Sequence, residues 1–334
     1  MDAQPFSTGV ASSGLRLLRL RHVLYGLCRE HRGYRRAQGL GQQEKDTMDQ
    51  ALTKHAAKQS SLVMNDETYK QFRAFIYEQT GISFQDNQKY LLESRLLPRL
   101  KEHKLATYED YYHYLRFDTY RDKELSSLYE LITTNETYFY RDIPQLENFI
   151  KTIVPALMEA NKATKQIRIW SAACSTGDEP YTLAIMLLEH LPLAGWNIEI
   201  LATDINDAVL TQARAGVYET HTLRHVPNML KRKYFVEQKG HFELTAAVKG
   251  RVKFMNLNLY DRPRLKLVRG IDAVFCRNCL IYFDDKAKLQ IVTDLHGTLK
   301  QNGYLVIGFS ESLTNMGNLF RTMQTGRSVV YQKV

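Results

Sequence analysis

The sequence predicts an α/β domain with a doubly wound, mostly parallel sheet, preceded by a small all-helical domain. Two observations carry this prediction. Between about residues 66 and 132, apolar residues recur at helical spacing and no convincing strand interrupts them. After residue 150, short β-rich runs alternate with helical patterns, as in chains that build parallel sheets covered by helices. We therefore expect a helical domain at residues 61–135 and a sheet domain at residues 136–334.

Four helices are expected in the first domain. The first should end at Gly81, because glycine readily closes a helix. The second spans about residues 86–103, and Pro98 within it predicts a kink or a break. The other two cover residues 108–115 and 124–132. The candidate core positions of the second helix are Tyr90, Leu91, Leu97 and Leu100.

Six strands are expected in the main sheet of the second domain, and the last of them should belong to a terminal hairpin. A small antiparallel β-subdomain should interrupt the alternation at about residues 219–251, because two β-rich runs flank Lys239-Gly240. The main-sheet strands are predicted at residues 166–173, 198–205, 252–259, 271–278, 303–310 and 328–334.

The composition excludes several classes of protein. With 334 residues, 44% of them hydrophobic and 24% charged, the chain is neither wholly disordered nor collagen-like. Its longest apolar runs fall far short of the ~20 residues that a membrane span needs, so we expect no stable membrane insertion. Four cysteines fit a reducing compartment, and we expect a cytoplasmic protein. We also expect a monomer.

Residues 1–60 read as a basic extension and linker without a fixed fold. Residues 1–47 contain eight Lys and Arg against four Asp and Glu, a large part of the net charge of +9. Four leucines between residues 17 and 27 share one helical face among arginines, so a membrane-surface or partner-binding helix is the alternative. The rest of the chain is only mildly basic, and its charge argues weakly for nucleic acid.

The turn after the first strand is rich in small residues. Ligands of open α/β sheets bind beyond the carboxyl ends of the strands, and small residues let the backbone approach them. Residues 171–177 read SAACSTG, and Asp178, Glu179 and Pro180 begin the next helix. The GxGxxG pattern is missing, and the two carboxylates would repel a phosphate but suit a cationic ligand. The alternative is an ordinary turn whose acidic residues complement the helix dipole.

Asp204 lies at the end of the second strand. An acidic residue there can accept hydrogen bonds from both hydroxyls of a ribose. Its alternative role is to cap the next helix, but Asn206 can do that instead. An acidic ribose contact without phosphate-binding features suggests a nucleoside that lacks phosphate, and S-adenosylmethionine is the common example.

The fourth strand ends in Arg277 and Asn278, two polar residues inside an apolar run. Buried polar groups are costly unless they are paired, so both should have partners. Cys276 and Cys279 form a CxxC pattern that would suit zinc or redox chemistry. No second cysteine pair completes a zinc site, and residues three apart on a strand face opposite sides. We therefore predict no metal site.

Six segments give the strongest signal when they are taken together. They read TTNETYFYRD, WSAACSTGDEPYTLAI, LATDIN, FMNLNLYD, FCRNCLIYF and GYLVIGFSESL. In order and spacing they resemble the CheR chemotaxis methyltransferases, over about residues 62–334. The resemblance implies a Rossmann-like class I S-adenosylmethionine-dependent methyltransferase domain with a small antiparallel β-subdomain, behind a small all-helical domain. It also implies methylation of glutamate side chains in the cytoplasmic domain of methyl-accepting chemoreceptors, with S-adenosylhomocysteine as the other product.

The same resemblance implies which residues form the site. Arg141 and Tyr282 match residues that lie near the transferred methyl group in the family, so they are the candidate catalytic residues. Cys279 stands where an aliphatic residue is usual. Contacts to the S-adenosylmethionine cofactor are implied for Asn135, Thr137, Arg141, Glu179, Asp204, Asn258, Leu259, Arg277 and Asn278.

Two features concern how a receptor would be recruited. The basic side of the second helix, with Arg95, Arg99 and Lys101, would meet the acidic methylation region of the receptor; the alternative is a solvated helix face. The turn at residues 238–241 looks shorter than in family members that bind a receptor's carboxy-terminal pentapeptide. We therefore expect this enzyme to work without that tether.

Two other functions compete with this one. A nucleic-acid methyltransferase should carry a base-clamping motif such as Asn-Pro-Pro-Tyr after the fourth strand, where this sequence reads Asn-Cys-Leu-Ile at residues 278–281. A non-catalytic scaffold that binds the cofactor and only docks receptors would not need Arg141 and Tyr282. We therefore expect a protein-glutamate O-methyltransferase that does not act on nucleic acid.

Overall fold

The computed structural model describes residues 63–192, 194–313, 319–325 and 328–334, and the structural statements below refer to these residues. The expectations for residues 1–60, the amphipathic helix included, lie outside them. Within the described part of the chain, no helix is both long enough and apolar enough to cross a membrane.

The first domain consists of helices, as the sequence predicts. Asn65 caps the first helix by accepting the backbone N–H of Thr68, and Gly81 ends it with a left-handed φ of 73°. A short 3-10 turn, η2 (Asp86–Gln88), leads into the second helix. The helices are α3 (Asp66–Thr80), α4 (Lys89–Glu102), α5 (Tyr108–Phe117) and α6 (Arg121–Ile132).

The expected core side of α4 is largely wrong. Tyr90 is 80% exposed, Leu91 is 38% exposed and Leu97 is half-buried, so only Leu100 was placed correctly. Leucines occupy neighbouring positions in this helix, so the sequence offers two apolar stripes, and packing against the other helices selects one of them. The fully buried residues of α4 are Leu92, Leu96 and Leu100.

Pro98 does not break α4, which continues to Glu102. A proline inside a helix removes one backbone donor, and its ring crowds the carbonyl four residues before it. Pro98 is exposed, so the lost hydrogen bond lies on the side of the helix that water reaches.

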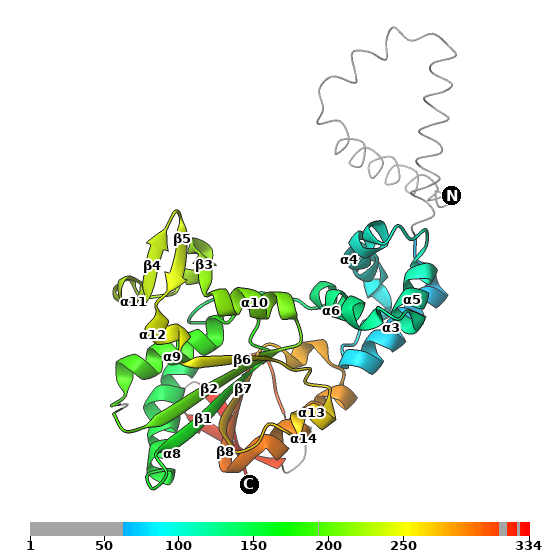
Figure 1. Ribbon diagram of the computed structural model, residues 1–334. Helices are drawn as coiled ribbons and strands as arrows, with labels where there is room; N and C mark the ends of the chain where they lie inside the picture. The colour runs from blue at the N-terminus through cyan, green and yellow to red at the C-terminus, as the bar shows by residue number, and fades with distance from the viewer. Residues whose placement is uncertain (1–62, 193, 314–318, 326–327) are drawn as a thin grey trace, which may run out of the picture. The chain divides into compact units, whose positions relative to one another are not determined.

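The main sheet of the second domain has seven strands in the order β6-β2-β1-β7-β8-β10-β9 (Figure 1). The first five of these pair in parallel, and β10 inserts antiparallel between β8 and β9. All six predicted strands are present, whereas β9 was missed because its sequence, FRTMQT, has no apolar alternation. The strands are β1 (Gln166–Ala172), β2 (Asn197–Asp204), β6 (Val252–Asn256), β7 (Ile271–Cys276), β8 (Leu299–Ile307), β9 (Phe320–Thr325) and β10 (Ser328–Lys333).

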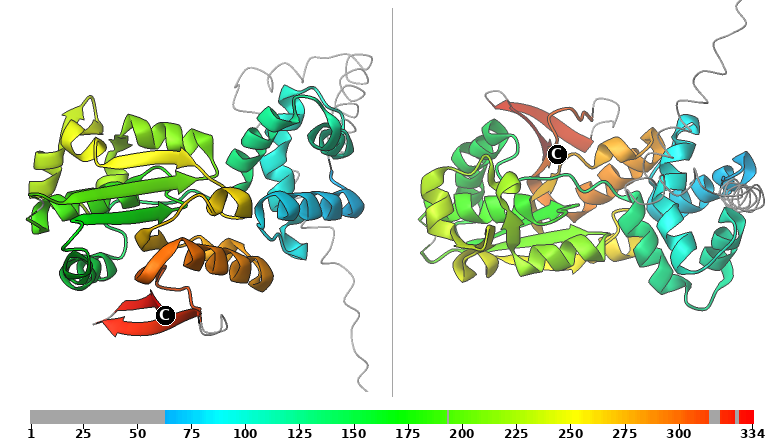
Figure 2. Two further views of the ribbon diagram at one scale, coloured as in Figure 1. Left: turned by 60° about the horizontal axis from the view of Figure 1, so that its bottom comes forward. Right: turned by 90° about the horizontal axis from the view of Figure 1, so that it is seen from above.

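Helices cover both faces of this sheet (Figures 1 and 2). Alternate residues of β1 enter two separate cores: Ile167 and Ile169 pack with α7 to α10, and Trp170 and Ala172 pack with α13 and α14. This alternation is the period of two that a strand buried on both faces requires. The helical segments are α7 (Ile143–Asn148), the π-helical turn η3 (Phe149–Ile153), α8 (Val154–Ala160), α9 (Asp178–His190), α10 (Asp207–Ala215), α13 (Arg262–Leu265) and α14 (Asp285–Thr298).

The β-subdomain is a three-stranded antiparallel sheet in the order β3-β5-β4. The predicted hairpin is present, and its turn is Lys239-Gly240, with φ angles of 49° and 84°. Two left-handed residues suit the twist of a two-residue hairpin. The third strand, β3, was missed because it is only three residues long. The elements are β3 (Val217–Glu219), η4 (Thr220–Leu223), α11 (Asn228–Tyr234), β4 (Phe235–Gln238), β5 (His241–Leu244) and α12 (Ala246–Lys249).

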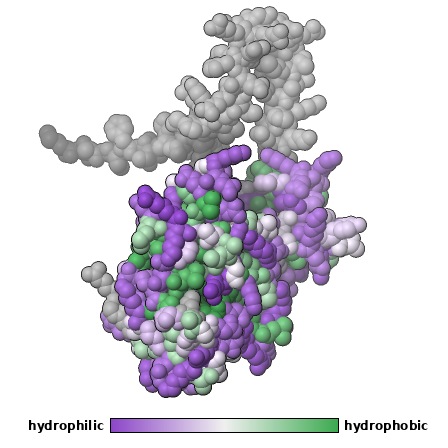
Figure 3. Space-filling view, turned by 60° about the vertical axis from the view of Figure 1, so that its left-hand side comes forward, coloured by the Kyte–Doolittle hydropathy of each residue, from purple (hydrophilic) through white to green (hydrophobic). Residues whose placement is uncertain are grey.

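Some large hydrophobic side chains remain on the surface. Phe309 is 83% exposed, Leu267 82% and Met229 72%; the first two lie in turns and the third in α11 (Asn228–Tyr234). On the face seen in Figure 3, hydrophobic patches are interspersed with hydrophilic side chains. Single exposed apolar residues are ordinary on globular proteins and do not by themselves mark a site.

Candidate active site

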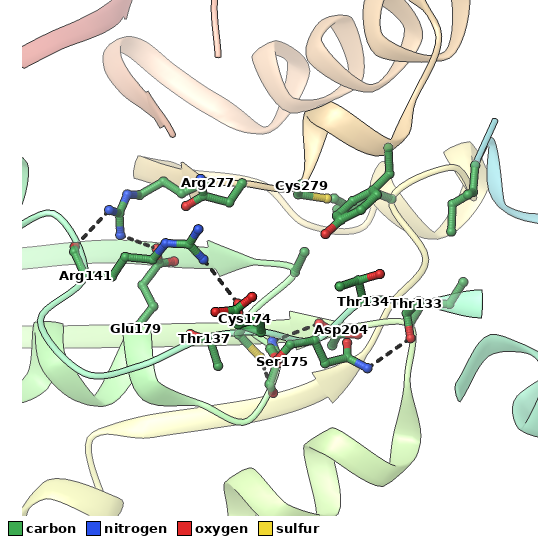
Figure 4. A pocket seen from close by; sticks show the side chains of 18 of the residues that line it. Thr133, Thr134, Thr137, Arg141, Cys174, Ser175, Glu179, Asp204, Arg277 and Cys279 are labelled. Atoms are coloured by element: carbon green, nitrogen blue, oxygen red, sulfur yellow. Dashed lines mark hydrogen bonds and ion pairs between the residues drawn. The ribbon is translucent and has the colours of Figure 1, made fainter. Parts of the chain in front are cut away.

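One cavity lies at the carboxyl ends of the parallel strands, where the sequence analysis places the site. The turns after β1, β2, β6 and β7 line it, together with residues 132–138, which join the two domains. Thr80 and Ile82 add to its wall from the helical domain. Figure 4 shows Arg141, Glu179 and Arg277 at one end, and Thr133, Thr134 and Asp204 toward the other.

The residues predicted for the cofactor and for the reacting centre all line this cavity. They come from segments that are far apart in the sequence, and the carboxyl edge of the sheet brings them together. The contact that each makes with a ligand stays a prediction. Arg95, Arg99 and Lys101 do not line the cavity. The lining set is Asn135, Thr137, Arg141, Glu179, Asp204, Asn258, Leu259, Arg277, Asn278 and Tyr282.

The turn after β1 has an unusual backbone. Ala173, Ser175 and Gly177 have left-handed φ angles of 61°, 50° and 88°. A Cβ atom on Gly177 would lie 3.0 Å from the Cβ of Ala213 and 3.2 Å from the hydroxyl of Tyr218, so a larger residue would be crowded as well as strained. Left-handed residues other than glycine are uncommon and gather at functional sites.

Asp204 lies against this turn and is 6% exposed. Its Oδ2 accepts the backbone N–H of Ser175 at 2.9 Å, and its Oδ1 accepts that of Asn206 at 3.0 Å. Burial raises the pKa of Asp204, and these two N–H groups oppose the rise. Asn206 caps α10, as predicted, by accepting from Ala208 and Val209. Each carboxylate oxygen can accept more than one hydrogen bond, so Asp204 keeps capacity for a ligand hydroxyl on both.

Arg277 is paired inside the protein, as its burial requires. Its side chain is 2% exposed. Nε donates to Oε1 of Gln145 at 2.6 Å, and Nη1 donates to Oε2 of Glu179 at 2.9 Å. Nη2 donates to Oδ2 of Asp142 at 2.7 Å and to the carbonyl of Arg141 at 2.9 Å. Arginine has five N–H donors, and most of those of Arg277 are engaged here. Through its bonds to Arg141 and Asp142, Arg277 holds these two residues against the end of β7.

Arg141 is placed by the backbone on either side of it. Tyr140 and Asp142 have left-handed φ angles of 61° and 60°. The N–H of Tyr140 donates to Oγ1 of Thr182 at 3.1 Å, which fixes the segment on α9. Nη1 of Arg141 donates to the carbonyl of Glu136 at 3.2 Å, and its guanidinium lines the cavity. Strained conformations of this kind persist only where several contacts hold them.

Two family models match the chain. The model described as "CheR methyltransferase, all-alpha domain" matches residues 67–133, and the one described as "CheR methyltransferase, SAM binding domain" matches residues 135–329. The chain belongs to the CheR methyltransferase family. It is an S-adenosylmethionine-dependent methyltransferase, and its cofactor is S-adenosylmethionine.

Curated relatives agree with this membership in the CheR family. "Chemotaxis protein methyltransferase 2" of Vibrio cholerae is 34% identical over 82% of this chain and 95% of its own length. "Chemotaxis protein methyltransferase" of Borreliella burgdorferi is 36% identical over 73% of this chain and 87% of its own. "Chemotaxis protein methyltransferase 1" of Pseudomonas aeruginosa is 34% identical over 79% of this chain and 97% of its own. They support S-adenosylmethionine-dependent methylation in chemotaxis as the function of this chain.

The cavity of this CheR-family chain fits its cofactor chemically. The carboxylates of Asp204 and Glu179 line it, and no lysine does among the described residues. Asp204 offers acceptors for ribose hydroxyls, and Glu179 offers a negative charge for the ammonium or sulfonium group. Ser171 Oγ donates to Oε1 of Glu179 at 2.7 Å, and Arg277 donates to Oε2 of Glu179, so this carboxylate is held in one orientation.

The helical domain takes part in the site, which sequence reasoning missed. Nδ2 of Asn258 donates to the carbonyl of Gln79 at 2.7 Å, and the N–H of Ser83 donates to the carbonyl of Tyr282 at 3.0 Å. These contacts fix the turns after β6 and β7 from outside the methyltransferase domain. No local pattern signals them, because each joins residues far apart in the sequence.

Glu311 is a second residue that sequence reasoning left without a role. Its Oε2 accepts the N–H groups of Asn278 at 2.9 Å and Gly308 at 2.6 Å, and its Oε1 accepts that of Ile281 at 3.2 Å. It thereby holds Asn278 in a left-handed conformation with φ 57° at the cavity wall. An acidic residue directly beyond a strand of the sheet was the signal that could have identified it.

Cys276 and Cys279 do not lie on opposite faces of one strand, contrary to the sequence-based expectation. Cys279 lies beyond the end of β7, in the turn that leads to η5 (Leu280–Tyr282), so it does not face away from Cys276. A hydrogen bond with Cys279 and burial both raise the pKa of the Cys276 thiol. Cys174, Cys276 and Cys279 are free thiols, and the described residues contain no cluster suited to a metal ion.

The three cations predicted on α4 do not form one exposed face. Arg95 Nη1 donates to the carbonyl of Ile132 at 2.5 Å. Arg99 donates through Nε and Nη2 to both oxygens of Glu124, at 2.8 and 2.5 Å, and Glu124 is only 3% exposed. Lys101 is exposed. Arg95 and Arg99 thus have structural partners, which the sequence could not reveal.

Proposed function

We propose that this CheR-family enzyme methylates glutamate side chains in the cytoplasmic domain of chemoreceptors and does not require a carboxy-terminal receptor pentapeptide. The observation that carries the proposal is the position of Arg141. Its guanidinium lines the same cavity as Asp204 and Glu179, so a site for a carboxylate substrate adjoins the carboxylates that suit the cofactor. The names of the relatives, all chemotaxis protein methyltransferases, support a chemoreceptor as the protein substrate.

The protein's own residues have simple tasks in this reaction. S-adenosylmethionine supplies an electrophilic methyl group when it is bound. A glutamate carboxylate with a pKa of ~4.3 is already ionised at neutral pH, so no general base is needed. Arg141 orients this carboxylate, and the hydroxyl of Tyr282 aligns it with the methyl group. The enzyme contributes positioning and the exclusion of water.

Independence from the tether is supported by the short turn of the β-subdomain. Lys239-Gly240 alone joins β4 to β5, which leaves little chain to build a pocket wall beside the sheet edge. A peptide added as a strand gains affinity from main-chain hydrogen bonds and specificity from side-chain pockets. On α4, Lys101 is the main remaining candidate for a receptor contact. Arg95 and Arg99 instead form hydrogen bonds with Ile132 and Glu124 of the protein itself.

The decisive experiment uses S-adenosylmethionine with a radiolabelled methyl group and membranes that contain chemoreceptors. We expect label in the receptor band and release of labelled methanol by base, as a glutamate methyl ester requires. Base-stable label, or label in added nucleic acid, would contradict the proposal. Binding of the cofactor without any transfer would favour the scaffold that only docks receptors.

A further inference from the structure

Tyr138, at the wall of the cavity, has two arginines from different parts of the chain near its ring. The Cζ atom of Arg224 is 3.8 Å from the centre of the Tyr138 ring, and that of Arg141 is 5.7 Å from it. The ring of His225 lies 5.2 Å from the same ring. A guanidinium over an aromatic face is held by the ring and still presents its N–H edge to other groups.

Contacts with the β-subdomain fix the positions of Tyr138 and Arg224. The N–H of Phe139 donates to the carbonyl of Thr222 at 3.1 Å, which ties the interdomain segment to the β-subdomain. The ring of Phe139 packs on those of Tyr218 at 4.8 Å and Phe235 at 5.3 Å. Nη1 of Arg224 donates to the carbonyl of His221 at 3.1 Å and Nε donates to Nε2 of His225 at 3.3 Å, which leaves Nη2 and one hydrogen of Nη1 for a ligand. The position of Arg224 beside Tyr138 is therefore built into the fold.

The charge of this group is not neutralised. Arg141 and Arg224 form no ion pair with any residue that the structure describes, and Arg224 is exposed. The acidic groups nearby are few: Glu136 is exposed on the cavity wall, and Glu219 pairs with His221 at 3.2 Å. Arg95 and Arg99, in contrast, are engaged within the helical domain and its linker.

We propose that Arg224 is a specificity-determining residue, which binds an acidic side chain of the protein substrate next to the glutamate that Arg141 holds. This inference rests on the proposed function and names the class of substrate as an acidic peptide segment. Arg224, which is exposed, is the outer binding group, and Arg141, which lines the cavity, is the inner one; both lie near the ring of Tyr138. A guanidinium fork suits a carboxylate, and two forks on one ring favour two carboxylates close together in a chain. A nucleic acid would call for a longer row of cations, because its affinity depends on many phosphate contacts.

The test compares Arg224→Gln with Arg232→Gln. Arg232 is an exposed arginine of α11 in the same subdomain, so both variants lose the same charge. With receptor as substrate, we expect Arg224→Gln to raise KM about fivefold or more and to change kcat less than about twofold, since a carboxylate contact outside the reacting centre is lost. The dissociation constant of S-adenosylmethionine should not change. Arg232→Gln should leave all three quantities near the wild-type values.

A binding measurement separates this inference from the proposed function. The probe is a synthetic peptide with two neighbouring glutamates, titrated in the presence of S-adenosylhomocysteine, with a glutamine-substituted peptide and a single-stranded oligonucleotide as further arms. Weaker binding to Arg224→Gln for the glutamate peptide alone supports the inference, whether or not a receptor is methylated. Equal binding by both variants, equal losses in both, or a loss confined to the oligonucleotide would overturn it. Absence of receptor methylation by the wild type, with the peptide result intact, would contradict only the proposed function.

Discussion

Asp204 combines burial with hydrogen bonds that leave its oxygens partly available. We expect Asp204→Ala to weaken S-adenosylmethionine binding by ~1.5–3 kcal/mol for each charged hydrogen bond that is lost. Because Asp204 also accepts the N–H groups of Ser175 and Asn206, the variant should be somewhat less stable as well. Calorimetric titration measures the binding, and thermal unfolding shows whether the variant is folded. Unchanged affinity in a folded variant would contradict the assignment.

Arg141 and Tyr282 should differ in how much they matter. Arg141→Ala is expected to lower kcat strongly, because no other free cation among the described residues lines the cavity beside the expected path of the substrate carboxylate. Tyr282→Phe should have a smaller effect if its hydroxyl only aligns the reacting groups. Initial rates at saturating cofactor measure both. Rates close to the wild type in both variants would refute their place at the reacting centre.

The buried carboxyl group of Asp178 should make the protein less stable as the pH rises. It is fully buried, its Oδ1 has no hydrogen-bond partner, and burial raises its pKa from 3.8 to about 6, against the lowering effects of Thr176 and His221. A raised carboxyl pKa in the folded state means that stability is lost as pH rises from about 4 through about 6. Asp178→Asn should remove this loss, so its stability relative to the wild type should grow by about 1 kcal/mol between pH 5 and pH 7.5.

The control for Asp178 is Asp285→Asn. Asp285 also begins a helix, α14, but its side chain is fully exposed. Urea unfolding at several pH values measures both variants. The same pH dependence in both would show that burial of Asp178 is not the cause.

Residue types were easier to predict than their partners. Motif spacing placed Asp204, Glu179 and Arg277 on one cavity, because the carboxyl ends of parallel strands meet at one edge. The role of Glu311 and the role proposed for Arg224 depend on contacts with residues far away in the chain, and a single sequence contains no record of those contacts.

At the scale of elements, Gly81 joins helix α3 to the cavity wall. A Cβ atom there would lie 2.6 Å from the ring of Tyr260, and the φ of 73° is left-handed. The next residues carry the bridge between Ile82 and Phe283, and the contact of Ser83 with the turn of the candidate catalytic tyrosine. Gly81→Ala should therefore lower stability by more than the ~1–2 kcal/mol of a left-handed backbone alone, and should lower kcat too.

Gly240→Ala is the control that separates backbone strain from the collision with Tyr260. Gly240 has a φ of 84°, also left-handed, but nothing lies within 4 Å of the Cβ position. Unfolding by urea and initial rates are measured for both variants. If Gly240→Ala is as damaging as Gly81→Ala, backbone strain rather than the collision with Tyr260 explains the loss.

Strands with strong apolar character were predicted well, whereas the remaining elements depended on tertiary context. The run in β7 is buried at every position and reads as a strand from its composition alone. The edge strand β9 and the short β3 lack such a run and form because a partner strand lies beside them. The buried side of α4 was misjudged for the same reason, because neighbouring helices choose between two leucine stripes.

At the scale of the molecule, the cavity depends on parts that the sequence keeps separate. The helical domain contributes Thr80 and Ile82, the linker contributes residues 132–138, and the β-subdomain positions the linker through Thr222. The cofactor is thus expected to be enclosed by the carboxyl edge of the sheet, the linker and the helical domain, while the β-subdomain acts on the cavity only through the linker. Substrate recognition should likewise combine charges from the linker and from the β-subdomain.

Recruitment of the receptor is a property of the whole molecule. If the two-residue turn Lys239-Gly240 leaves no pocket for a peptide strand, methylation should not depend on a pentapeptide at the receptor's carboxyl end. Recognition would then rest on exposed charges, which salt screens beyond ~8–10 Å at physiological ionic strength, so KM for receptor should rise with salt while kcat changes little. The measurement compares receptors with and without a tail that ends in Trp and Phe anchors, at low and high salt, beside a titration of the isolated pentapeptide. Micromolar binding of the pentapeptide together with tail-dependent methylation would show that the short turn does not prevent tethering.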